Sequence, residues 1–340
     1  MRKILLIYTG GTIGMISNAQ SGALESLDFA HLNAHIPELN RFDLEIEVKS
    51  FDTPLDSSEI NPLHWKVIAS WITEAYDAFD GFVILHGTDT MSYTGSALSY
   101  MLQGLRKPVI LTGSQLPIGI IRTDGKENII TAIEMAAAHN ENGEAILQEV
   151  AIYFESSLFR ANRSSKISAH QFRAFATPNY PLLAMAGVQI EWYKENLFRT
   201  PLLELQSVFD LDKRVLFWQL FPGMPIDLYA KSLEFPHVQI LILETFGVGN
   251  AFSEPAFQAL LQEFITKGGL ILNITQCQSG AVQQGAYQTS TFFEKIGVIS
   301  GADLTAEAAL TKAMYALANL PQQQRAAFLK SNIVGELSVG

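Results

Sequence analysis

The hydrophobic residues of this 340-residue chain follow two alternating patterns. Short runs that are almost entirely apolar predict strands buried on both faces of a sheet, and longer runs with apolar residues three and four positions apart predict helices. In the first half of the chain the predicted strands are Ile4–Tyr8, Leu44–Phe51, Phe82–Leu85, Val109–Thr112 and Val150–Phe154. Because strands and helices alternate, we predict an α/β fold with a mostly parallel sheet that helices cover on both faces.

Three helices are predicted between these strands, at Asn61–Tyr76, Thr90–Leu105 and Lys126–His139. The first has the clearest start. Asn61 is a favoured N-cap residue, and Pro62 suits the first helical position because the N–H that proline lacks is not needed there.

The alternation loosens near residues 177–181, and the polar stretch 191–206 has no clear period. We therefore predict a larger N-terminal domain at residues 1–190, a linker at 191–212 and a smaller C-terminal α/β domain at 213–340. We expect Ser253 to cap the first helix of the second domain and Gly268-Gly269 to end it. The elements predicted there are strands Val215–Leu220, Ile240–Leu243 and Leu270–Ile274, and helices Ser253–Thr266, Thr305–Leu320 and Gln322–Lys330.

Composition and charge narrow the classes of partner. The formal net charge is −11, which argues against nucleic acid, because binding to phosphates needs lysine and arginine. No apolar stretch reaches the roughly 18 residues of a membrane span. The one cysteine, Cys277, cannot form an internal disulfide, which suits a reducing compartment. The run Met1–Tyr8 leads into a glycine turn without a signal-peptide cleavage pattern, so we predict a cytoplasmic protein.

Hydroxyl residues follow two of the predicted strands. Thr12 lies in the glycine-rich turn Gly10–Gly14, and Thr88 precedes Asp89 and Thr90. Reactive groups of open α/β sheets gather at the carboxyl ends of strands, so these residues resemble a nucleophile and its activating group. A tight strand–helix turn without chemistry, or a nucleotide site lacking the usual fingerprints, would also account for the glycines.

Other candidate residues have plausible structural roles as well. Asp89 could cap a helix or bind a ligand ammonium group, and Asp56–Ser58 could cap a helix or bind a ligand carboxylate. A lysine in a polar loop, such as Lys166, is usually solvated. If Lys166 were buried beside Thr88 and Asp89, it could accept a proton.

A metal site is not predicted. His31 and His35 are four residues apart, but no third ligand is indicated. Cys277 has no evident histidine partner, and we interpret it as structural.

Several motifs occur in order over nearly the whole chain and resemble those of the bacterial-type L-asparaginases, in particular the cytoplasmic type I branch. The segments that carry the resemblance are Tyr8–Met15, Asp56–Ser58, Gly81–Met91, Lys107–Gln115, Asn162–Lys166 and Phe246–Asn250. The first and third are the most specific for the asparaginase/glutaminase superfamily.

The resemblance implies hydrolysis of L-asparagine to L-aspartate and ammonia without a metal or organic cofactor. Thr12 matches the family's nucleophile, which forms a β-aspartyl enzyme, and Thr88, Asp89 and Lys166 match its second catalytic group. Asp56, Ser57, Ser58 and Asp89 match the residues that bind the substrate's carboxylate and ammonium groups. The implied fold is a larger N-terminal α/β domain with a smaller flavodoxin-like C-terminal domain, and the implied assembly is a homodimer or a dimer of dimers.

Two other functions remain open. A mixed glutaminase-asparaginase differs only by about one methylene of pocket depth, worth about 1–3 kcal/mol. A non-catalytic amino-acid sensor could use the same pocket, because fold does not determine function. An amidotransferase subunit is less expected, since such subunits carry a domain before the glycine turn.

The chain departs from the family in the segment after the glycine turn, where members usually carry a tyrosine and residues 15–28 have none. Our hypothesis is that Glu25 instead orients or deprotonates Thr12. We therefore expect Glu25→Gln to lower the turnover of asparagine and to shift its pH profile. Unchanged steady-state kinetics across pH would eliminate this role for Glu25.

Overall fold

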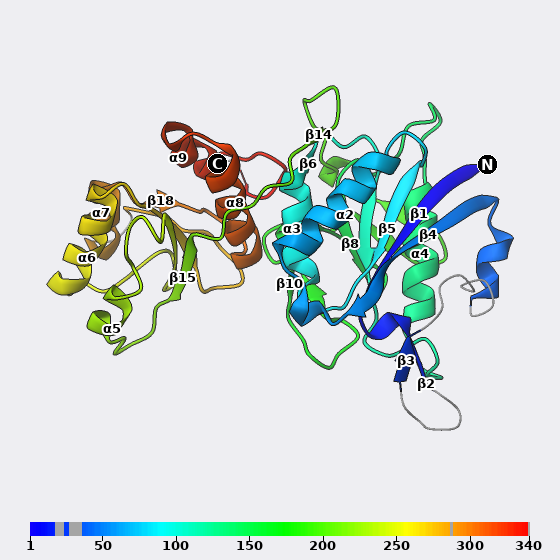
Figure 1. Cartoon of the computed structure of the whole chain (residues 1–340), viewed down its shortest axis with the longest axis horizontal. Coiled ribbons are helices and arrows are strands. Elements are labelled where there is room, and N and C mark those ends of the chain that lie inside the picture. Colours follow the sequence, from blue (N-terminus) through cyan, green and yellow to red (C-terminus); the bar gives the residue numbers. More distant parts are fainter. Residues whose placement is uncertain (18–23, 27–35, 286–287, 339–340) are drawn as a thin grey trace. The chain divides into compact units, whose positions relative to one another are not determined.

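The computed structural model describes residues 1–17, 24–26, 36–285 and 288–338. It divides into two compact units, Met1–Phe209 and Asp210–Gly340 (Figure 1). The division falls inside the segment 191–212 that we predicted as a linker. Glu191, the first residue of that segment, belongs to a strand of the first unit.

The described part of the first unit contains an eight-stranded sheet with the order β13-β12-β9-β8-β7-β5-β1-β4. Strands β4, β1, β5, β7 and β8 are parallel to one another, whereas β9, β12 and β13 are added antiparallel. The α/β class with a largely parallel sheet is therefore confirmed. The strands are β1 (Arg2–Gly10), β4 (Leu44–Leu55), β5 (Gly81–Leu85), β7 (Val109–Thr112), β8 (Val150–Phe154), β9 (Ser157–Arg160), β12 (Ala184–Ala186) and β13 (Ile190–Trp192).

Helices pack on both faces of this sheet, which explains why its central strands are apolar throughout. Successive side chains of a strand point to opposite faces. Ile110 of β7 belongs to the same core cluster as Ile129 and Ile133 of α4 (Gly125–Ala137). Its neighbour Leu111 lies against Gly95 of α3 (Met91–Met101) on the other face.

The start of α2 (Pro62–Ala75) follows the predicted capping. The Asn61 side chain accepts a hydrogen bond from the Leu63 N–H, and His64 completes a capping box. Helix α3 ends at Met101, four residues before the predicted end. The chain there forms β6 (Leu102–Gln103), which pairs with β14 (Gln206–Ser207), so a long-range strand pairing overrides the local helical pattern.

The second unit contains a four-stranded parallel sheet whose strands follow chain order: β15 (Val215–Gln219), β16 (Ile240–Thr245), β17 (Leu270–Thr275) and β18 (Ile299–Ser300). Separate apolar clusters pack against the two faces of this sheet. Its described helices are α5 (Ile226–Ala230), α6 (Pro255–Thr266), α7 (Gln288–Ile296), α8 (Ala306–Asn319) and α9 (Gln322–Lys330).

The start predicted for α6 is wrong. The helix begins at Pro255 with Glu254 as its N-cap, and Ser253 lies one residue too early to cap it. Proline fixes the first helical position because its φ angle is already helical. The predicted end is confirmed. Gly268 has a φ of +104°, and the N–H groups of Gly268 and Gly269 donate to the Ile265 and Phe264 carbonyls.

Four short strands form two further hairpin-like pairs in the first unit. These are β2 (Met15–Ser17) with β3 (Leu24–Ser26), and β10 (Ser165–Lys166) with β11 (Phe175–Ala176). Among the helices that the structure describes, none has the length and apolar character needed to cross a membrane.

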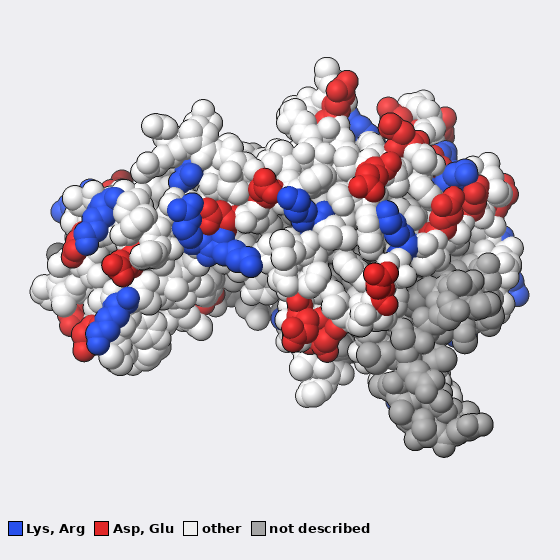
Figure 2. Space-filling view, in the orientation of Figure 1, with Lys and Arg blue, Asp and Glu red and all other residues white. Residues whose placement is uncertain are grey.

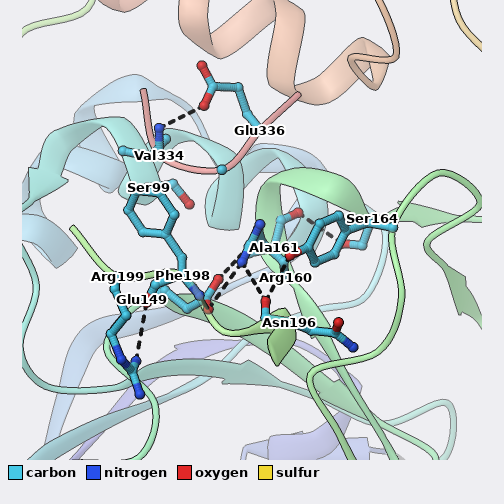
Figure 3. Close-up of polar contacts among 12 residues, drawn as sticks. Ser99, Glu149, Arg160, Ala161, Ser164, Asn196, Phe198, Arg199, Val334 and Glu336 are labelled. Atoms are coloured by element: carbon cyan, nitrogen blue, oxygen red, sulfur yellow. Dashed lines mark hydrogen bonds and ion pairs between the residues drawn. The ribbon is translucent and has the colours of Figure 1, made fainter. Parts of the chain in front are cut away.

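A buried ion pair lies at the base of the β8–β9 hairpin, and its two residues also form hydrogen bonds to a later segment of the chain (Figure 3). The Arg160 Nε donates to Glu149 Oε2 at 2.6 Å, and both side chains are 5% exposed. The second Glu149 oxygen accepts from the Phe198 N–H, and Arg160 also donates to the Asn196 carbonyl. The guanidinium lies 4.3 Å from the ring centroid of Tyr180. Each charge is thus compensated where water is excluded.

We expect Glu149→Gln to lower the free energy of unfolding by about 3–5 kcal/mol, because it leaves the Arg160 charge buried without a counter-ion. Urea denaturation of the two proteins measures this difference. Glu263→Gln is the matched control, because the Glu263–Lys267 pair is exposed; it should cost less than about 1 kcal/mol. Similar losses for both variants would contradict the assignment.

Candidate active site

The strand order of the first unit reverses at β1, which has β4 on one side and β5 on the other. Where the order reverses, the loops after neighbouring parallel strands lead to opposite faces of the sheet and leave a crevice at the carboxyl edge. The loop after β1 carries Thr12, and the loop after β5 carries Thr88 and Asp89. The fold therefore brings the two hydroxyl motifs to the position where open α/β sheets bind ligands.

The glycine turn after β1 fits tightly against the loop after β5. Gly10 and Gly11 have φ angles of +129° and +85°, which favour glycine. The Gly11 N–H donates to the Leu55 carbonyl at 3.0 Å, and a Cβ atom added to Gly11 would lie 2.5 Å from the Gly87 Cα. Thr12 follows at once and starts a short 3-10 helix, Thr12–Gly14.

The loop after β4, which carries Ser57, also contacts the loop after β5. A Cβ atom added to Gly87 would lie 2.7 Å from the Ser57 Oγ, and Ser57 is buried. The Thr90 hydroxyl donates to the Ser57 carbonyl at 2.6 Å. The segments that carry Thr12, Thr88 and Ser57 are therefore in contact with one another.

Lys166 joins this cluster from a distant part of the sequence. Its Nζ donates to Thr88 Oγ1 at 2.7 Å and to Asp89 Oδ1 at 2.6 Å. The Lys166 side chain is 16% exposed, whereas the Asp89 side chain is 66% exposed. Lys166 thus lies beside Thr88 and Asp89, as our hypothesis requires, while the carboxylate remains open to a ligand.

Gln115 is a neighbour of Thr88 that we did not single out from the sequence. The Thr88 hydroxyl donates to Gln115 Oε1 at 3.5 Å, and Gln115 Nε2 donates to the Gln171 carbonyl. Asp124 holds this loop by accepting from the Gln115 and Leu116 N–H groups. Gln115 follows β7, the strand next to β5, so the strand-end argument applied to every strand could have found it.

Asp56 and Ser58 have the capping arrangement that their pattern suggested. Asp56 Oδ1 accepts from the Ser58 N–H and the Ser58 hydroxyl, both at 2.8 Å, at the start of the 3-10 helix Ser57–Glu59. These bonds lower the pKa of Asp56, and the bond from the Ser58 N–H has the largest effect. Both residues are exposed, so they remain accessible to a ligand.

The remaining candidate residues from the sequence are Thr12, Glu25, His31, His35 and Cys277. Glu25 pairs with Ile16 in the β2–β3 hairpin, but its side chain lies outside the described residues. The Thr12 hydroxyl is half-buried and has no hydrogen-bond partner within the described residues. His31 and His35 lie outside the described residues, and Cys277 is exposed.

Comparison with known proteins identifies the family. Residues 3–198 match the model "Asparaginase, N-terminal", and residues 214–328 match "Glutaminase/Asparaginase C-terminal domain". The chain belongs to the asparaginase family. The resemblance inferred from its motifs is therefore confirmed.

Relatives within this family cover the whole length of the chain. The L-asparaginase 1 of Escherichia coli K12 is 40% identical, over 99% of this chain and 98% of its own. The crystal structure of L-asparaginase I from Vibrio cholerae superposes with a TM-score of 0.89 at 37% identity, covering 99% of both chains. The thermostable L-asparaginase of Thermococcus kodakarensis gives 0.90 at 29% identity, covering 99% and 100%.

The backbone contact at Gly11 can be tested by substitution. We expect Gly11→Ala to destabilise the protein by about 1–3 kcal/mol beyond the cost of its φ angle, because the new methyl group overlaps the Gly87 backbone. Gly143→Ala is the control, since Gly143 has a φ of +80° and open space around it. It should show only the backbone cost, about 1–2 kcal/mol. Equal losses in urea denaturation would refute the contact.

Proposed function

We propose that this protein hydrolyses L-asparagine to L-aspartate and ammonia, with Thr12 as nucleophile and a β-aspartyl acyl-enzyme intermediate. The proposal rests on one observation above all: the Lys166 amine bonds to Thr88 and Asp89 beside the turn that carries Thr12. The relatives named L-asparaginases support the choice of substrate.

The reaction needs a nucleophile, a base and a path for a proton to the leaving nitrogen. The Thr12 oxygen attacks the side-chain amide carbon and loses its proton. The tetrahedral intermediate then breaks its C–N bond, and the departing amide nitrogen takes up that proton and leaves as ammonia. Lys166, donating to Thr88 Oγ1, lowers the cost of removing the Thr88 proton. Thr88 can then activate the Thr12 hydroxyl in the first step and water in the second, which releases aspartate and regenerates Thr12.

The same cluster offers complementary charge for an amino acid. Asp89 shares one oxygen with Lys166, and its exposed carboxylate can accept a hydrogen bond from the α-ammonium group. Ser57 and Ser58 follow Asp56 at the start of a short helical turn, where hydroxyl and N–H groups can bind the α-carboxylate.

We further infer that the enzyme needs no metal or organic cofactor, acts in the cytoplasm and forms a homodimer or a dimer of dimers. Neither nucleic acid nor a membrane is an expected partner, given the net charge of −11 and the mixture of acidic and basic side chains on the visible face of each unit (Figure 2).

We expect Thr12→Ala and Lys166→Met each to lower kcat for L-asparagine by about 10³-fold or more, because each removes a group that acts on the reacting atoms. Ammonia release with L-asparagine, D-asparagine and L-glutamine measures this. Thr266→Ala and Lys267→Met change exposed residues of the same types and should leave the rate unchanged.

The outcomes separate the three candidate functions. An asparaginase releases ammonia mainly from L-asparagine, and a mixed glutaminase-asparaginase releases it at comparable rates from L-glutamine. A non-catalytic sensor binds an amino acid without turnover, in the unmodified protein as in Thr12→Ala. An active Thr12→Ala variant would contradict the proposed nucleophile.

A further inference from the structure

On the buried side of Thr88, three side chains form a chain of hydrogen bonds that ends on the backbone of the loop after β5. His86 Nδ1 lies 2.6 Å from the Gly87 carbonyl oxygen, and His86 Nε2 lies 2.8 Å from Thr94 Oγ1. The indole N–H of Trp65 donates to the same Thr94 oxygen at 2.9 Å. His86 and Thr94 are fully buried, and Trp65 is 5% exposed.

The chemistry of the partners determines where every proton in this chain lies. A carbonyl oxygen can only accept, so the His86 proton is on Nδ1. In a neutral imidazole Nε2 is then an acceptor, so the Thr94 hydroxyl donates to it and in turn accepts from Trp65. Burial lowers the pKa of His86 to about 4, so the ring is neutral at pH 7. The donors therefore all point in one direction, from Trp65 through Thr94 and His86 to Gly87.

This direction also orients the peptide bond between Gly87 and Thr88. In a planar trans peptide the carbonyl and the N–H point in opposite directions. Because the Gly87 carbonyl points to the buried His86 ring, the Thr88 N–H points away from that ring. This N–H has no hydrogen-bond partner within the described residues. The Gly87 carbonyl is therefore fixed on the buried side of the peptide, and the Thr88 N–H on the opposite side can donate to a ligand.

The two helices that supply Thr94 and Trp65 also border the candidate site. Thr94 lies on α3, one turn after Thr90, whose hydroxyl donates to the Ser57 carbonyl. Trp65 lies in the first turns of α2, the helix that follows Ser57. The chain thus links the segments that carry Ser57, Thr88 and Asp89 through bonds shielded from solvent.

We propose that His86 is a positioning residue of the reaction: as the last link of the Trp65–Thr94–His86 chain, it fixes the Gly87–Thr88 peptide and so the direction in which Thr88 presents its N–H and hydroxyl groups to the substrate. This inference rests on the proposed amide hydrolysis, because it assigns His86 a part in that reaction. His86 acts only through the loop and touches neither substrate nor the reacting atoms.

Substitutions at His86 separate its hydrogen bond from its volume. His86→Phe fills the space but cannot donate to Gly87, and we expect kcat for asparagine to fall about 10- to 100-fold, with KM changing less than about threefold. The Asn side chain can place Nδ2 near the position of Nδ1, so His86→Asn should regain most of this loss. His139 also bonds to a carbonyl through Nδ1, at 2.8 Å from Ala137, but away from the site. His139→Phe is the control and should keep the unmodified kcat.

The protonation state provides a readout that does not depend on activity. The ¹⁵N spectrum of the imidazoles should show His86 with a protonated Nδ1 and an unprotonated Nε2 at pH 7. Thr94→Val removes the donor to Nε2 and should allow the other tautomer to appear, with a smaller fall in kcat than His86→Phe. If His86→Phe does not fold, Thr94→Val and His86→Asn still test the chain.

Two results would overturn the inference: a folded His86→Phe variant with kcat within about twofold of the unmodified enzyme, or a spectrum with the His86 proton on Nε2. Failure of the proposed function is distinguishable, because an unmodified protein that releases no ammonia would refute the hydrolysis while the spectrum still reports on the His86 tautomer.

Discussion

The candidate site depends on the contact between the backbones of Gly11 and Gly87. A Cβ atom added to Gly11 would overlap the Gly87 backbone, and a Cβ atom added to Gly87 would overlap the Ser57 side chain. The distance between the loops after β1 and β5 is therefore set by backbone atoms, which move less than side chains. Thr12 and Thr88 directly follow the two glycines, so the same backbone contact restricts the distance between these threonines.

Two polar networks of different character flank Thr88. On the ligand side, Lys166 and Asp89 are charged and partly exposed, and their bonds can respond to a substrate. On the buried side, His86 belongs to a neutral and fully satisfied chain of hydrogen bonds. In a low dielectric an uncompensated charge is costly, whereas a complete neutral network is rigid. We infer that the buried network holds the loop, and the exposed one carries the chemistry.

The position of Lys166 depends on a third arrangement, farther from the site. Arg160 ends β9, and the short helix Ala161–Arg163 leads from it to the strand that carries Lys166. Arg160 bonds to Glu149, and Arg163 donates to the Asn179 carbonyl, while both guanidinium groups lie over the Tyr180 ring. These buried cations stabilise the turn from which Lys166 reaches Thr88.

Local sequence patterns determined much of the fold: β8 and α9 have the bounds predicted from apolar runs, and Asn61 caps α2 as its residue type requires. The same patterns predicted that Thr12 and Thr88 follow strands. Such predictions succeed because the alternation of side chains and the residue preferences of turns depend on only a few neighbouring residues. They could not end α3 at Met101, where the chain pairs with a strand that begins at residue 206, nor detect the role of His86. Only the tertiary structure decided that Lys166, which lies 78 residues after Thr88, bonds to it. The energy of such a contact depends on burial and on neighbours that are distant in sequence, and therefore no local pattern contains it.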